Sequence, residues 1–551
     1  MRLCNEASSP SRVTDAPFNQ PQSSPGSQPL KPPMALEILG AIRGALSAHT
    51  WILLLTFLVL LAWYSVLPYG FFKRLGVPGP RPLPFIGTFL WYRKGFFNFD
   101  TECYKKYGKI WGIYDARQPI LSIMDTELIK TIFIKEFYTL FTNRRDFGLN
   151  GPLAESILIV EDERWKRIRS VLSPTFTSGR LKEMFPVINH YANNLVEFAG
   201  KKAKLNESVD LKDIFGMYSM DVVTSTAFSV DVDSINNPND PFVSNIKKMA
   251  NFSLFNPILL CALIFPALLP VLVKLDYSFF PRDVTAFFMS ALEDLKSKRL
   301  KGVHTDRVDF LQLMVDSQTT HISSEKQNGA SNSTYKALTD TEILAQAMTF
   351  IFAGYETTSN TLSYVAYNLA THPDVQKKLQ QEIDEAFPNK ATPTYEAVMQ
   401  LEYLEMVISE TLRLYPPAPR IDRVCKKDVQ INGMTIPKGT VVMVPAYVLH
   451  HDPAYWPEPE EFRPERFNKE ERESRNPSIY LPFGMGPRNC IGMRFAQLVM
   501  KLSLASLLQH LTFVPCKETP IPLELDVKGP MHPKKPIILK FVPRVNGDSK
   551  E

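Results

Sequence analysis

Residues 44–72 carry no charged side chain, with His49 neutral, and this stretch constrains the fold of the 551-residue chain more than any other feature. Its centre, from Trp51 to Tyr64, is almost wholly apolar. A helix needs about 20 apolar residues to cross the hydrocarbon core of a bilayer, so the stretch is long enough. Aromatic residues lie near both of its ends, as interfacial anchors do. We therefore predict a single-pass transmembrane anchor at residues 44–72.

A cleaved signal peptide is the alternative for this stretch. No small-x-small cleavage site follows it, and the apolar run is longer than in most signal peptides, which favours a retained anchor. Lys73, Arg74 and Arg81 follow the stretch, against Lys31 and Arg43 before it. Because positive charge collects on the cytosolic side of a membrane helix, the body of the chain is predicted to be cytosolic.

The segments on either side of the anchor differ in composition from the body. Residues 1–33 hold seven prolines and six serines with few large apolar side chains, so we expect a disordered extension. Translation can start at Met1 or at Met34, and the sequence leaves both open. Residues 73–84 include four alternating prolines and are predicted to form a stiff, extended hinge.

Charge and cysteine content exclude several function classes. The net charge is +5, from 62 Lys and Arg against 57 Asp and Glu, which is too balanced to favour nucleic acid as a partner. The six cysteines form no C-x-x-C pair and are too sparse for a disulfide scaffold. Neither G-x-G-x-x-G nor a G-K-[ST] loop occurs, so we expect no nucleotide bound by this chain itself.

Long helical patterns dominate the chain after residue 150, which predicts a mostly α fold with small β-sheets. Thr339 and Glu342 match a capping box, and no proline follows until Pro373, so a helix of about 32 residues is expected there. Alternating β-rich stretches occur at 109–124 and 429–444. Further helices are predicted at 373–387, 401–415 and 491–511. Asn432-Gly433 is predicted to form a hairpin turn.

A second uncharged stretch occupies residues 251–273. Its length would pass for a membrane span, but Pro257, Pro266 and Pro270 interrupt it. We predict short apolar helices that dip into the membrane or cover an apolar entrance. Buried core is the alternative.

The long helix predicted after Thr339 has an unusual centre. Glu356 is the one charged side chain between Glu342 and Asp374, and a carboxylate among apolar residues is costly unless it is paired or functional. Thr357 is expected to bond back to a helix carbonyl. The sequence leaves two interpretations open: a proton-relay group beside a ligand, or a structural Glu paired with an arginine.

Cys490 lies where a Gly- and Pro-rich loop meets the predicted helix 491–511. Arg488 and the helix dipole are expected to lower the pKa of its thiol. Such a site suits a metal thiolate or a nucleophile, although the local sequence offers no His partner for a nucleophile. An inert buried thiol is the alternative.

Glu410 and Arg413 share one helix face, and we predict a buried structural network with Arg466 as a third member.

Together these motifs resemble the cytochrome P-450 superfamily. A-G-x-E-T at 353–357, E-x-x-R at 410–413, P-E-R-F at 464–467 and F-x-x-G-x-R-x-C-x-G at 483–492 occur in the order of that family. The cysteine motif is highly specific, whereas E-x-x-R alone carries little weight. The segments 161–176 and 423–433 look like those of the 3A-type, drug- and steroid-oxidising members. The resemblance covers about residues 34 to 545, with residues 85–545 as a haem-thiolate catalytic domain, and residues 1–33 depart from it.

The resemblance implies roles for individual residues. Cys490 would be the thiolate ligand of the iron of haem b (iron protoporphyrin IX), and thiolate donation favours O–O cleavage. Glu356 and Thr357 would handle oxygen and protons on the opposite face. The residues implied to hold the haem are Arg144, Trp165, Arg169, Arg423, Arg488 and Phe483, since guanidinium groups suit carboxylates.

Some positions match the substrate side of the family, where residues vary most. These are Phe147, Phe352, Ala353, Ala418 and Ile421, and Leu158 replaces a polar residue expected in 3A-type relatives. The implied activity is a microsomal monooxygenase that hydroxylates bulky lipophilic substrates such as steroids and xenobiotics with O₂. Electrons would come from NADPH through a separate NADPH–cytochrome reductase, with cytochrome b5 as a further partner. The protein would be anchored in the endoplasmic reticulum membrane with its body in the cytosol.

Three rivals stay open. A thromboxane-synthase-like isomerase would rearrange an endoperoxide without external electrons, but Thr357 argues against it, because oxygen activation needs a hydroxyl there. A haem-binding sensor or carrier would not need Glu356 and Thr357 together. A lumenal body is the third rival, and glycosylation of a sequon at Asn206, Asn251 or Asn332 would support it.

Overall fold

The computed structural model describes residues 48–250, 256–301, 309–325, 337–526 and 531–544. The chain divides between Trp63 and Tyr64 into two compact units. The predicted disordered extension, residues 1–33, lies outside the described residues, as do the sequon residues Asn251 and Asn332. Those predictions therefore stay predictions.

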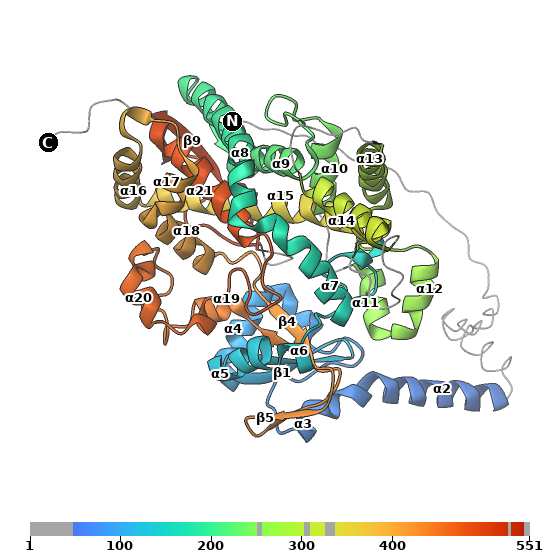
Figure 1. The fold of residues 1–551 in the computed structure, drawn as a ribbon. Coiled ribbons are helices and arrows are strands. Elements are labelled where there is room, and N and C mark those ends of the chain that lie inside the picture. Colours follow the sequence, from blue (N-terminus) through green and yellow to red (C-terminus); the bar gives the residue numbers. More distant parts are fainter. Residues whose placement is uncertain (1–47, 251–255, 302–308, 326–336, 527–530, 545–551) are drawn as a thin grey trace, which may run out of the picture. The chain divides into compact units, whose positions relative to one another are not determined.

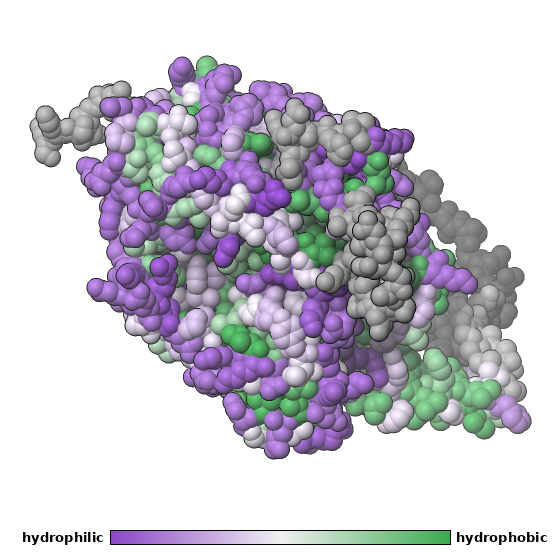
Figure 2. Space-filling view, viewed as in Figure 1, coloured by the Kyte–Doolittle hydropathy of each residue, from purple (hydrophilic) through white to green (hydrophobic). Residues whose placement is uncertain are grey.

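The predicted anchor coincides with an apolar helix. α2 (Ala48–Val66) leads into η1 (Leu67–Gly70) and α3 (Phe71–Arg74), and this stretch is long and apolar enough to cross a membrane. Its apolar side chains are exposed, as the green surface along α2 in Figure 2 shows. Residues 44–47 of the predicted anchor lie outside the described residues. Length, composition and exposure thus agree with a membrane helix.

The larger sheet has four strands in the order β1–β2–β7–β4. β2 pairs antiparallel with β1 and parallel with β7, and β4 pairs antiparallel with β7, where Arg423 faces Val442. The strands are β1 (Ile110–Asp115), β2 (Gln118–Ile123), β7 (Val441–Val444) and β4 (Ile421–Val424). Both β-rich stretches predicted from the sequence therefore contain strands of this sheet.

Two smaller sheets complete the β structure of the described residues. One has the order β3–β9–β8, and the other is the β5–β6 hairpin. Asn432 and Gly433 turn this hairpin with φ of 49° and 80°, as the sequence predicts. The strands are β3 (Ser208–Asp210), β9 (Ile538–Pro543), β8 (Leu511–Pro515), β5 (Val429–Ile431) and β6 (Met434–Ile436).

Helices make up most of the larger unit, which confirms the predicted fold class (Figure 1). Helices 373–387, 401–415 and 491–511 are found as α16, α18 and α21, shortened at their ends by one or two residues. The helices not yet given are η2 (Phe89–Lys94), α4 (Phe96–Tyr107), α5 (Thr126–Lys130), the π-helix η3 (Thr131–Lys135), α6 (Phe137–Leu140), η4 (Gly151–Glu155), α7 (Asp162–Leu172), η5 (Ser173–Phe176), α8 (Ser178–Lys204), α9 (Leu211–Phe228), α10 (Pro241–Ala250), α11 (Pro257–Ile264), η6 (Pro266–Leu268), α12 (Leu269–Lys274), α13 (Arg282–Leu300), α14 (Phe310–Glu325), α15 (Asp340–Thr371), α16 (Pro373–Ala386), η7 (Pro388–Lys390), α17 (Tyr395–Gln400), α18 (Glu402–Leu414), α19 (Ala446–His450), η8 (Pro464–Phe467), α20 (Lys469–Ser474), η9 (Pro477–Ile479) and α21 (Met493–His510).

α15 is the central helix of the large apolar core. It has 32 residues and begins with the predicted capping box of Thr339 and Glu342. It packs against α9, α13, α14, α18 and α21, and Figure 1 shows it passing among them. A Cβ at Gly354 would overlap the side chain of Val223 on α9. Glycine at this position therefore lets α9 approach α15 closely.

Short helices replace a straight span in the second apolar stretch. Together, α11 and the η6–α12 segment are long and apolar enough to span a membrane, but the chain bends by 113° between them. Leu259 is buried, whereas Leu268, Val271 and Val273 are 41, 53 and 56% exposed. The prediction of short apolar helices is confirmed for residues 256–274. Their exposure rules out buried core for the stretch as a whole.

The Glu410 network is buried as predicted. Glu410 lies 2.7 Å from Arg413 Nε and 3.2 Å from Arg466 Nε. All three side chains are at most 6% exposed.

The proline-rich hinge lies along the larger sheet, because the Gly112 N–H of β1 donates to the Pro78 carbonyl at 2.8 Å.

Candidate functional site

Cys490 ends a tight loop that precedes α21. Its backbone N–H donates to the carbonyl oxygen of Phe483 at 2.8 Å, which closes the loop. Gly486 has a φ of +74°, and a Cβ there would overlap the carbonyl oxygen of Phe133 in η3. Glycine is thus required twice over, by the left-handed backbone and by the close approach of a second segment. These constraints explain the spacing of the cysteine motif.

Arginines from distant segments fasten this loop. Arg169 on α7 donates to the carbonyl oxygen and side-chain oxygen of Asn489 at 2.9 and 3.0 Å. Arg144 donates to the Arg488 carbonyl at 3.2 Å. The Arg488 guanidinium donates to the carbonyls of Thr142 and Val160, each at 2.8 Å. The loop is therefore joined to residues 142–160 and to α7.

The charges around the Cys490 thiol differ from those predicted. Burial raises the pKa of this thiol, and the Gly492 N–H and the charges of Arg144 and Arg169 lower it. The net direction is upward, so the predicted lowering is wrong for the protein chain alone, because burial outweighs the nearby charges. The prediction that Arg488 supplies the favourable charge is also wrong, since backbone carbonyls hold its guanidinium.

Four of the predicted haem contacts form a cluster of guanidinium groups. Arg423 and Arg488 are each 2% exposed, and Arg144 and Arg169 are half-buried. Burial lowers the pKa of all four, and repulsion from Arg144 lowers the pKa of the other three further, to about 9 for Arg488. Asp422 raises the pKa of Arg144, Arg423 and Arg488. Like charges held this close favour an anionic partner.

Unpaired polar atoms mark the same place. Trp165 Nε1, Arg423 Nε and Arg488 Nε are buried and have no hydrogen-bond partner among the residues that the structure describes. A buried donor left unpaired costs about 1–3 kcal/mol. The ring of Trp165 lies under the Arg488 guanidinium, 5.2 Å from it. Unpaired donors, clustered positive charge and a cysteine thiol together fit a haem, which has two carboxylates and an iron.

On α15, an accessible strip interrupts an otherwise buried helix. Thr357 is exposed, and Phe352 and Ala353 are half-buried, although most of their neighbours along the helix are buried. The Thr357 hydroxyl donates to the Ala353 carbonyl at 2.7 Å, as the sequence predicts. The hydroxyl and the apolar side chains of this strip can therefore meet a ligand.

Glu356 faces a different set of groups from Thr357. Its Oε1 accepts a hydrogen bond from Asn360 Nδ2 at 2.8 Å and lies 3.1 Å from Lys212 Nζ. His532 Nε2 lies 3.5 Å from the same oxygen. The structural alternative of an arginine partner is wrong, because lysine, asparagine and histidine surround the carboxylate. In this arrangement the carboxylate and the Thr357 hydroxyl bond to separate partners.

The matched substrate-side positions are spread over several elements. Phe147 packs edge-on against Phe279, and Phe352 packs against Phe280. The other positions are Ala418, which is exposed, Ile421 at the start of β4, which is half-buried, and Leu158, which is 39% exposed. Aromatic pairs join two of these positions to residues 279–280, which follow the bent helices α11 and α12.

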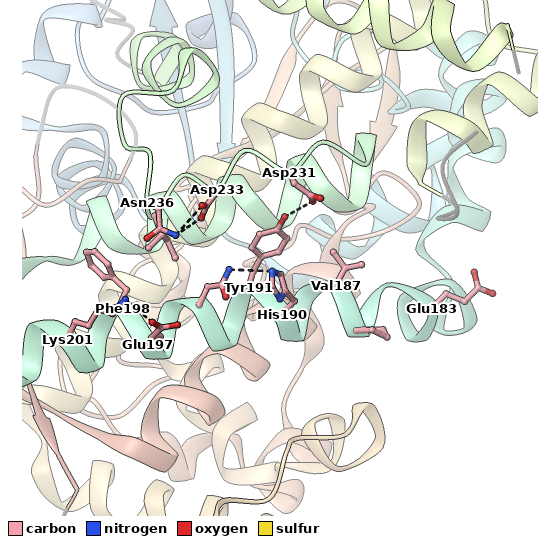
Figure 3. A pocket seen from close by; sticks show the side chains of 13 residues that line it. Glu183, Val187, His190, Tyr191, Glu197, Phe198, Lys201, Asp231, Asp233 and Asn236 are labelled. Atoms are coloured by element: carbon pink, nitrogen blue, oxygen red, sulfur yellow. Dashed lines mark hydrogen bonds and ion pairs between the residues drawn. The ribbon is translucent and has the colours of Figure 1, made fainter. Parts of the chain in front are cut away.

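A surface pocket of about 600 Å³ lies away from all of these residues. It opens between α8 and the segment after α9, where the Tyr191 hydroxyl donates to Asp231 at 2.7 Å (Figure 3). Its lining includes Glu183, Glu197 and Asp233. An acidic and polar lining does not suit a lipophilic substrate, so this pocket is not the candidate site.

Sequence comparison agrees with the geometry of the Cys490 loop. The family model of Cytochrome P450 matches residues 77–541, so the chain belongs to the cytochrome P450 family. Membership in this family supports a haem-thiolate monooxygenase.

Within the family, the similar proteins include several of the 3A type. Cytochrome P450 3A30 of Fundulus heteroclitus is 57% identical over 499 residues, which are 91% of this chain and 99% of that protein. Cytochrome P450 3A9 of Rattus norvegicus is 56% identical over 504 residues, 91% of this chain and 98% of that protein. Cytochrome P450 3A13 of Mus musculus is 57% identical over 498 residues, 90% and 97% of the two chains. The predicted resemblance to 3A-type members is confirmed.

Sequence reasoning missed the partners of Glu356. Lys212 lies 144 residues before Glu356 in the chain, and His532 lies 176 residues after it. No local spacing connects them, so no pattern in the sequence could have brought them together. Asp422 raises the pKa of Arg423, its neighbour in the chain, and also the pKa of Arg144 and Arg488, and only these two distant partners lie beyond what local spacing could predict.

Proposed function

We propose that this chain is a membrane-anchored monooxygenase that binds haem b and hydroxylates bulky lipophilic substrates. The observation that carries the proposal is the guanidinium cluster around the Cys490 loop, with three unpaired buried donors among the described residues. A structural role does not account for such a cluster, because unneutralised buried charge is costly. A ligand with two carboxylates and a metal ion that binds a thiolate accounts for the cluster.

In this proposal the haem is held by side chains from four segments: the Cys490 loop, the residues after α6, α7 and β4. Cys490 is the iron ligand, and Phe483 lies at the opposite end of the same loop. Arg144, Arg169, Arg423, Arg488 and Trp165 hold the propionates. Arginine suits this task because its fixed fork of donors matches a carboxylate. Trp165 Nε1, as a lone donor, takes one further carboxylate oxygen.

When bound, the haem supplies the reductive activation of O₂ on which monooxygenation depends. The residues of α15 supply what that reaction needs from the protein. The Thr357 hydroxyl is accessible and donates its one O–H to the Ala353 carbonyl, so its lone pairs can accept a hydrogen bond from a ligand, and it can pass on its own proton once the O–H turns away from that carbonyl. Glu356 is the nearest carboxyl along the helix and is proposed to restore the proton that the hydroxyl gives up.

The proposed substrates are steroids and xenobiotics. The accessible residues Phe352 and Ala353 on α15, with Phe147 near residues 279–280, would present an apolar surface to them. Burial of a large apolar substrate stabilises binding by roughly 25 cal/mol per Å², which needs few polar contacts. The exact substrate is left to the screen described below.

The proposed location is the endoplasmic reticulum membrane, with the catalytic unit in the cytosol. The support is the apolar helix that begins at Ala48 and the basic residues Lys73 and Arg74 at its far end. The sequence has no dinucleotide-binding motif, so the proposed electron donor is a separate NADPH–cytochrome reductase, with cytochrome b5 as a further partner.

A carbon-monoxide difference spectrum of the reduced protein tests the ligand assignment. We expect the thiolate-type band in the wild type and its loss in Cys490→Ala, with Cys425→Ala as the matched control at a buried cysteine outside the loop. An unchanged thiolate band in Cys490→Ala would overturn the assignment.

Turnover with purified reductase, NADPH and a panel of steroids and drugs tests the activity. We expect NADPH-dependent hydroxylation by the wild type. For Thr357→Ala we expect continued NADPH consumption with about a tenfold or larger fall in product and a matching rise in hydrogen peroxide. Conversion of an endoperoxide without NADPH would support the isomerase instead, and haem binding without any product would support a sensor or carrier.

A further inference from the structure

Glu356 lies in a polar network on the side of α15 that faces α9 and the residues from Met531 onward. Its Oε1 has three neighbours: Asn360 Nδ2 at 2.8 Å, Lys212 Nζ at 3.1 Å and His532 Nε2 at 3.5 Å. Its Oε2 is buried and has no hydrogen-bond partner within the described part of the chain. A buried carboxylate oxygen left this way is a place for a proton or for water.

The Asn360 amide determines which nitrogen of His532 carries the proton. Asn360 Nδ2 lies 2.8 Å from Glu356 Oε1 and 3.3 Å from His532 Nδ1, so its two N–H bonds reach both acceptors. The opposite amide orientation would set an oxygen against the carboxylate, which is unfavourable. Nδ1 of the neutral ring is therefore an acceptor and Nε2 carries the proton, and Nε2 lies 3.5 Å from Glu356 Oε1, longer than a good hydrogen bond.

A pocket of about 210 Å³ lies beside this ring. Lys212, Asn360 and His532 line it together with Asp210 and Tyr364. A water molecule takes up about 30 Å³ in the liquid, so the pocket has room for several. Three of the lining residues are also the three that contact Glu356. Glu356 itself does not line the pocket, so these three side chains lie between the pocket and the carboxylate.

Lys212 holds the carboxylate in place, and burial lowers the pKa of its ammonium group although the charge of Glu356 raises it. Its ammonium group lies 2.8 Å from Ser359 Oγ and 3.4 Å from the Glu356 carbonyl, in addition to its contact with Oε1. All three contacts are to α15, so the ammonium serves as a clamp. A protonated amine also has no lone pair to take up a proton, whereas an imidazole has one nitrogen of each kind.

We propose that solvent protons enter at this pocket and reach Glu356 through the imidazole of His532. His532 is then a positioning and proton-transfer residue that acts through Glu356, and the proposal rests on the function proposed above for Glu356. The 3.5 Å contact between His532 Nε2 and Glu356 Oε1 and the place of His532 in the wall of the pocket carry the inference.

The transfer balances without any change of oxidation state. A hydronium ion in the pocket protonates Nδ1 as the Asn360 amide turns aside, while the Nε2–H bond breaks and an O–H bond forms on Glu356 Oε1. The ring is then neutral with its proton on Nδ1. Nδ1 then loses its proton to pocket water, and a hydronium ion of the pocket supplies a new proton to Nε2 when the ring turns towards the pocket, which restores the resting tautomer. Each cycle delivers one solvent proton.

The charges around His532 set its resting state. Burial lowers the pKa of His532, and the ammonium of Lys212 lowers it further, while the carboxylates of Glu356 and Asp526 raise it. The net direction is downward, so the ring is neutral at pH 7 and protonated only transiently. Asp210 and Tyr364, the other titratable groups of the pocket, face the same space from α9's first turn and from α15.

The first test compares His532→Gln with the wild type in full-length holoenzyme with reductase. The steroid of the panel that gives the wild type its highest yield is the probe. Product and hydrogen peroxide per NADPH are measured between about pH 6 and pH 8, the range in which histidine titrates. Glutamine can still hydrogen-bond but cannot titrate. The carbon-monoxide spectrum checks folding and haem content, and His532→Asn serves as the second variant.

For the wild type we expect product per NADPH to rise as the pH falls towards the pKa of His532. For His532→Gln we expect a loss of about tenfold, smaller than the hundredfold or more of a group that transfers the proton directly, and no such rise. The matched control is His190→Gln, an exposed histidine on α8, which should keep the wild-type profile. Wild-type yield and profile in both His532 variants would overturn the proposal.

The second test needs no turnover. Histidine labelled with ¹³C at Cε1 gives at most nine signals in this chain, and His532→Gln identifies the relevant one. Glu356→Gln should lower the pKa of His532, and Lys212→Met should raise it, because the two charges act in opposite directions. Unchanged pKa values in both variants would overturn the contact. If the wild type gives no product while these shifts occur, the proposed function fails and the contact geometry stands.

Discussion

Two clusters of buried arginine in this chain are neutralised in different ways. In the first, Glu410 receives two hydrogen bonds from Arg413, at 2.7 and 2.9 Å, and one from Arg466 at 3.2 Å. Arg413 also donates to the His450 carbonyl at 2.8 Å. One carboxylate at the centre thus binds both guanidinium groups, and the cluster is complete within the protein.

The second cluster surrounds the Cys490 loop. Arg423 and Arg488 are as buried as the arginines of the first cluster, yet their partners are mainly backbone carbonyls and each leaves its Nε unpaired within the described residues. Arg144 repels both of them. The comparison shows that burial alone does not distinguish a structural arginine from one that binds a ligand. The clusters differ in direct ion pairs: Glu410 pairs with both arginines of the first cluster, whereas no carboxylate of the described residues forms an ion pair with Arg423 or Arg488, and Asp422 only raises their pKa values.

The largest effect is expected from removing the central carboxylate of the first cluster. Glu410→Gln leaves Arg413 and Arg466 buried without an opposite charge, so the free energy of unfolding should fall by about 3–5 kcal/mol. Urea denaturation of the holoenzyme, followed by far-ultraviolet circular dichroism, measures it. Glu402→Gln, at the exposed start of the same helix, should change nothing measurable. Equal stability of the two variants would remove the distinction between the clusters.

A buried carboxylate that has no cation partner among the described residues gives the next effect. Asp221 is 1% exposed, and burial raises the pKa of its carboxyl group to about 6, from 3.8. Because the folded-state pKa is the higher one, this group's contribution to stability is full below about pH 4 and is lost as the pH rises through about 6. At pH 7.5 its charge costs of order 3 kcal/mol.

Asp221→Asn should therefore stabilise the protein at pH 7.5 by about that amount and leave its stability unchanged below about pH 4. The variant and the wild type are compared by urea denaturation across this range, so that other titrating groups cancel. A variant that is less stable than the wild type at pH 7.5 would mean that Asp221 has a cation partner or an essential charge-assisted hydrogen bond.

Arg423→Met tests the second cluster directly. Because no carboxylate of the described residues forms an ion pair with Arg423, its replacement by an apolar side chain of similar size should leave folding stability nearly unchanged. Haem should dissociate about tenfold faster, the size of effect seen when an outer partner of a metal centre is removed. Transfer of haem to apomyoglobin measures the rate.

Arg420→Met is the contrasting control for that experiment. Arg420 forms a two-point ion pair with buried Asp100, with both distances 2.7 Å. Its loss should destabilise the fold, as in the first cluster, without accelerating haem release from the protein that stays folded. If both variants behave alike, the arginines near Cys490 are structural.

The sequence predicted what depends on local spacing. The two residues of the capping box, Thr339 and Glu342, are three positions apart in the chain, and so are Glu410 and Arg413. Both pairs are found as expected. The cysteine motif is also local, since Gly486 and the Cys490 N–H shape one loop. Such features require only the geometry of a helix or of a turn.

The sequence could not predict which charge meets which across the fold. It assigned the favourable charge at Cys490 to Arg488, its neighbour in the chain, whereas Arg144 and Arg169 provide it from distant segments. It likewise offered Glu356 an arginine, whereas Lys212 and His532 surround it. Partners separated by more than 100 residues are set by the packing of helices, which residue spacing does not encode.

The smallest effect is expected at an exposed ion pair, which completes the comparison. Lys201 and Glu197 lie one turn apart on α8 with 2.7 Å between their charged atoms, a shorter distance than that of Arg466 to Glu410. Their side chains are 65 and 68% exposed, so water and salt screen the charges. Glu197→Gln should leave the urea midpoint within experimental error at low and at high salt. A clear loss of stability would show that the distance between charges, and not their burial, decides what an ion pair contributes in this protein, and it would weaken the distinction between the two arginine clusters.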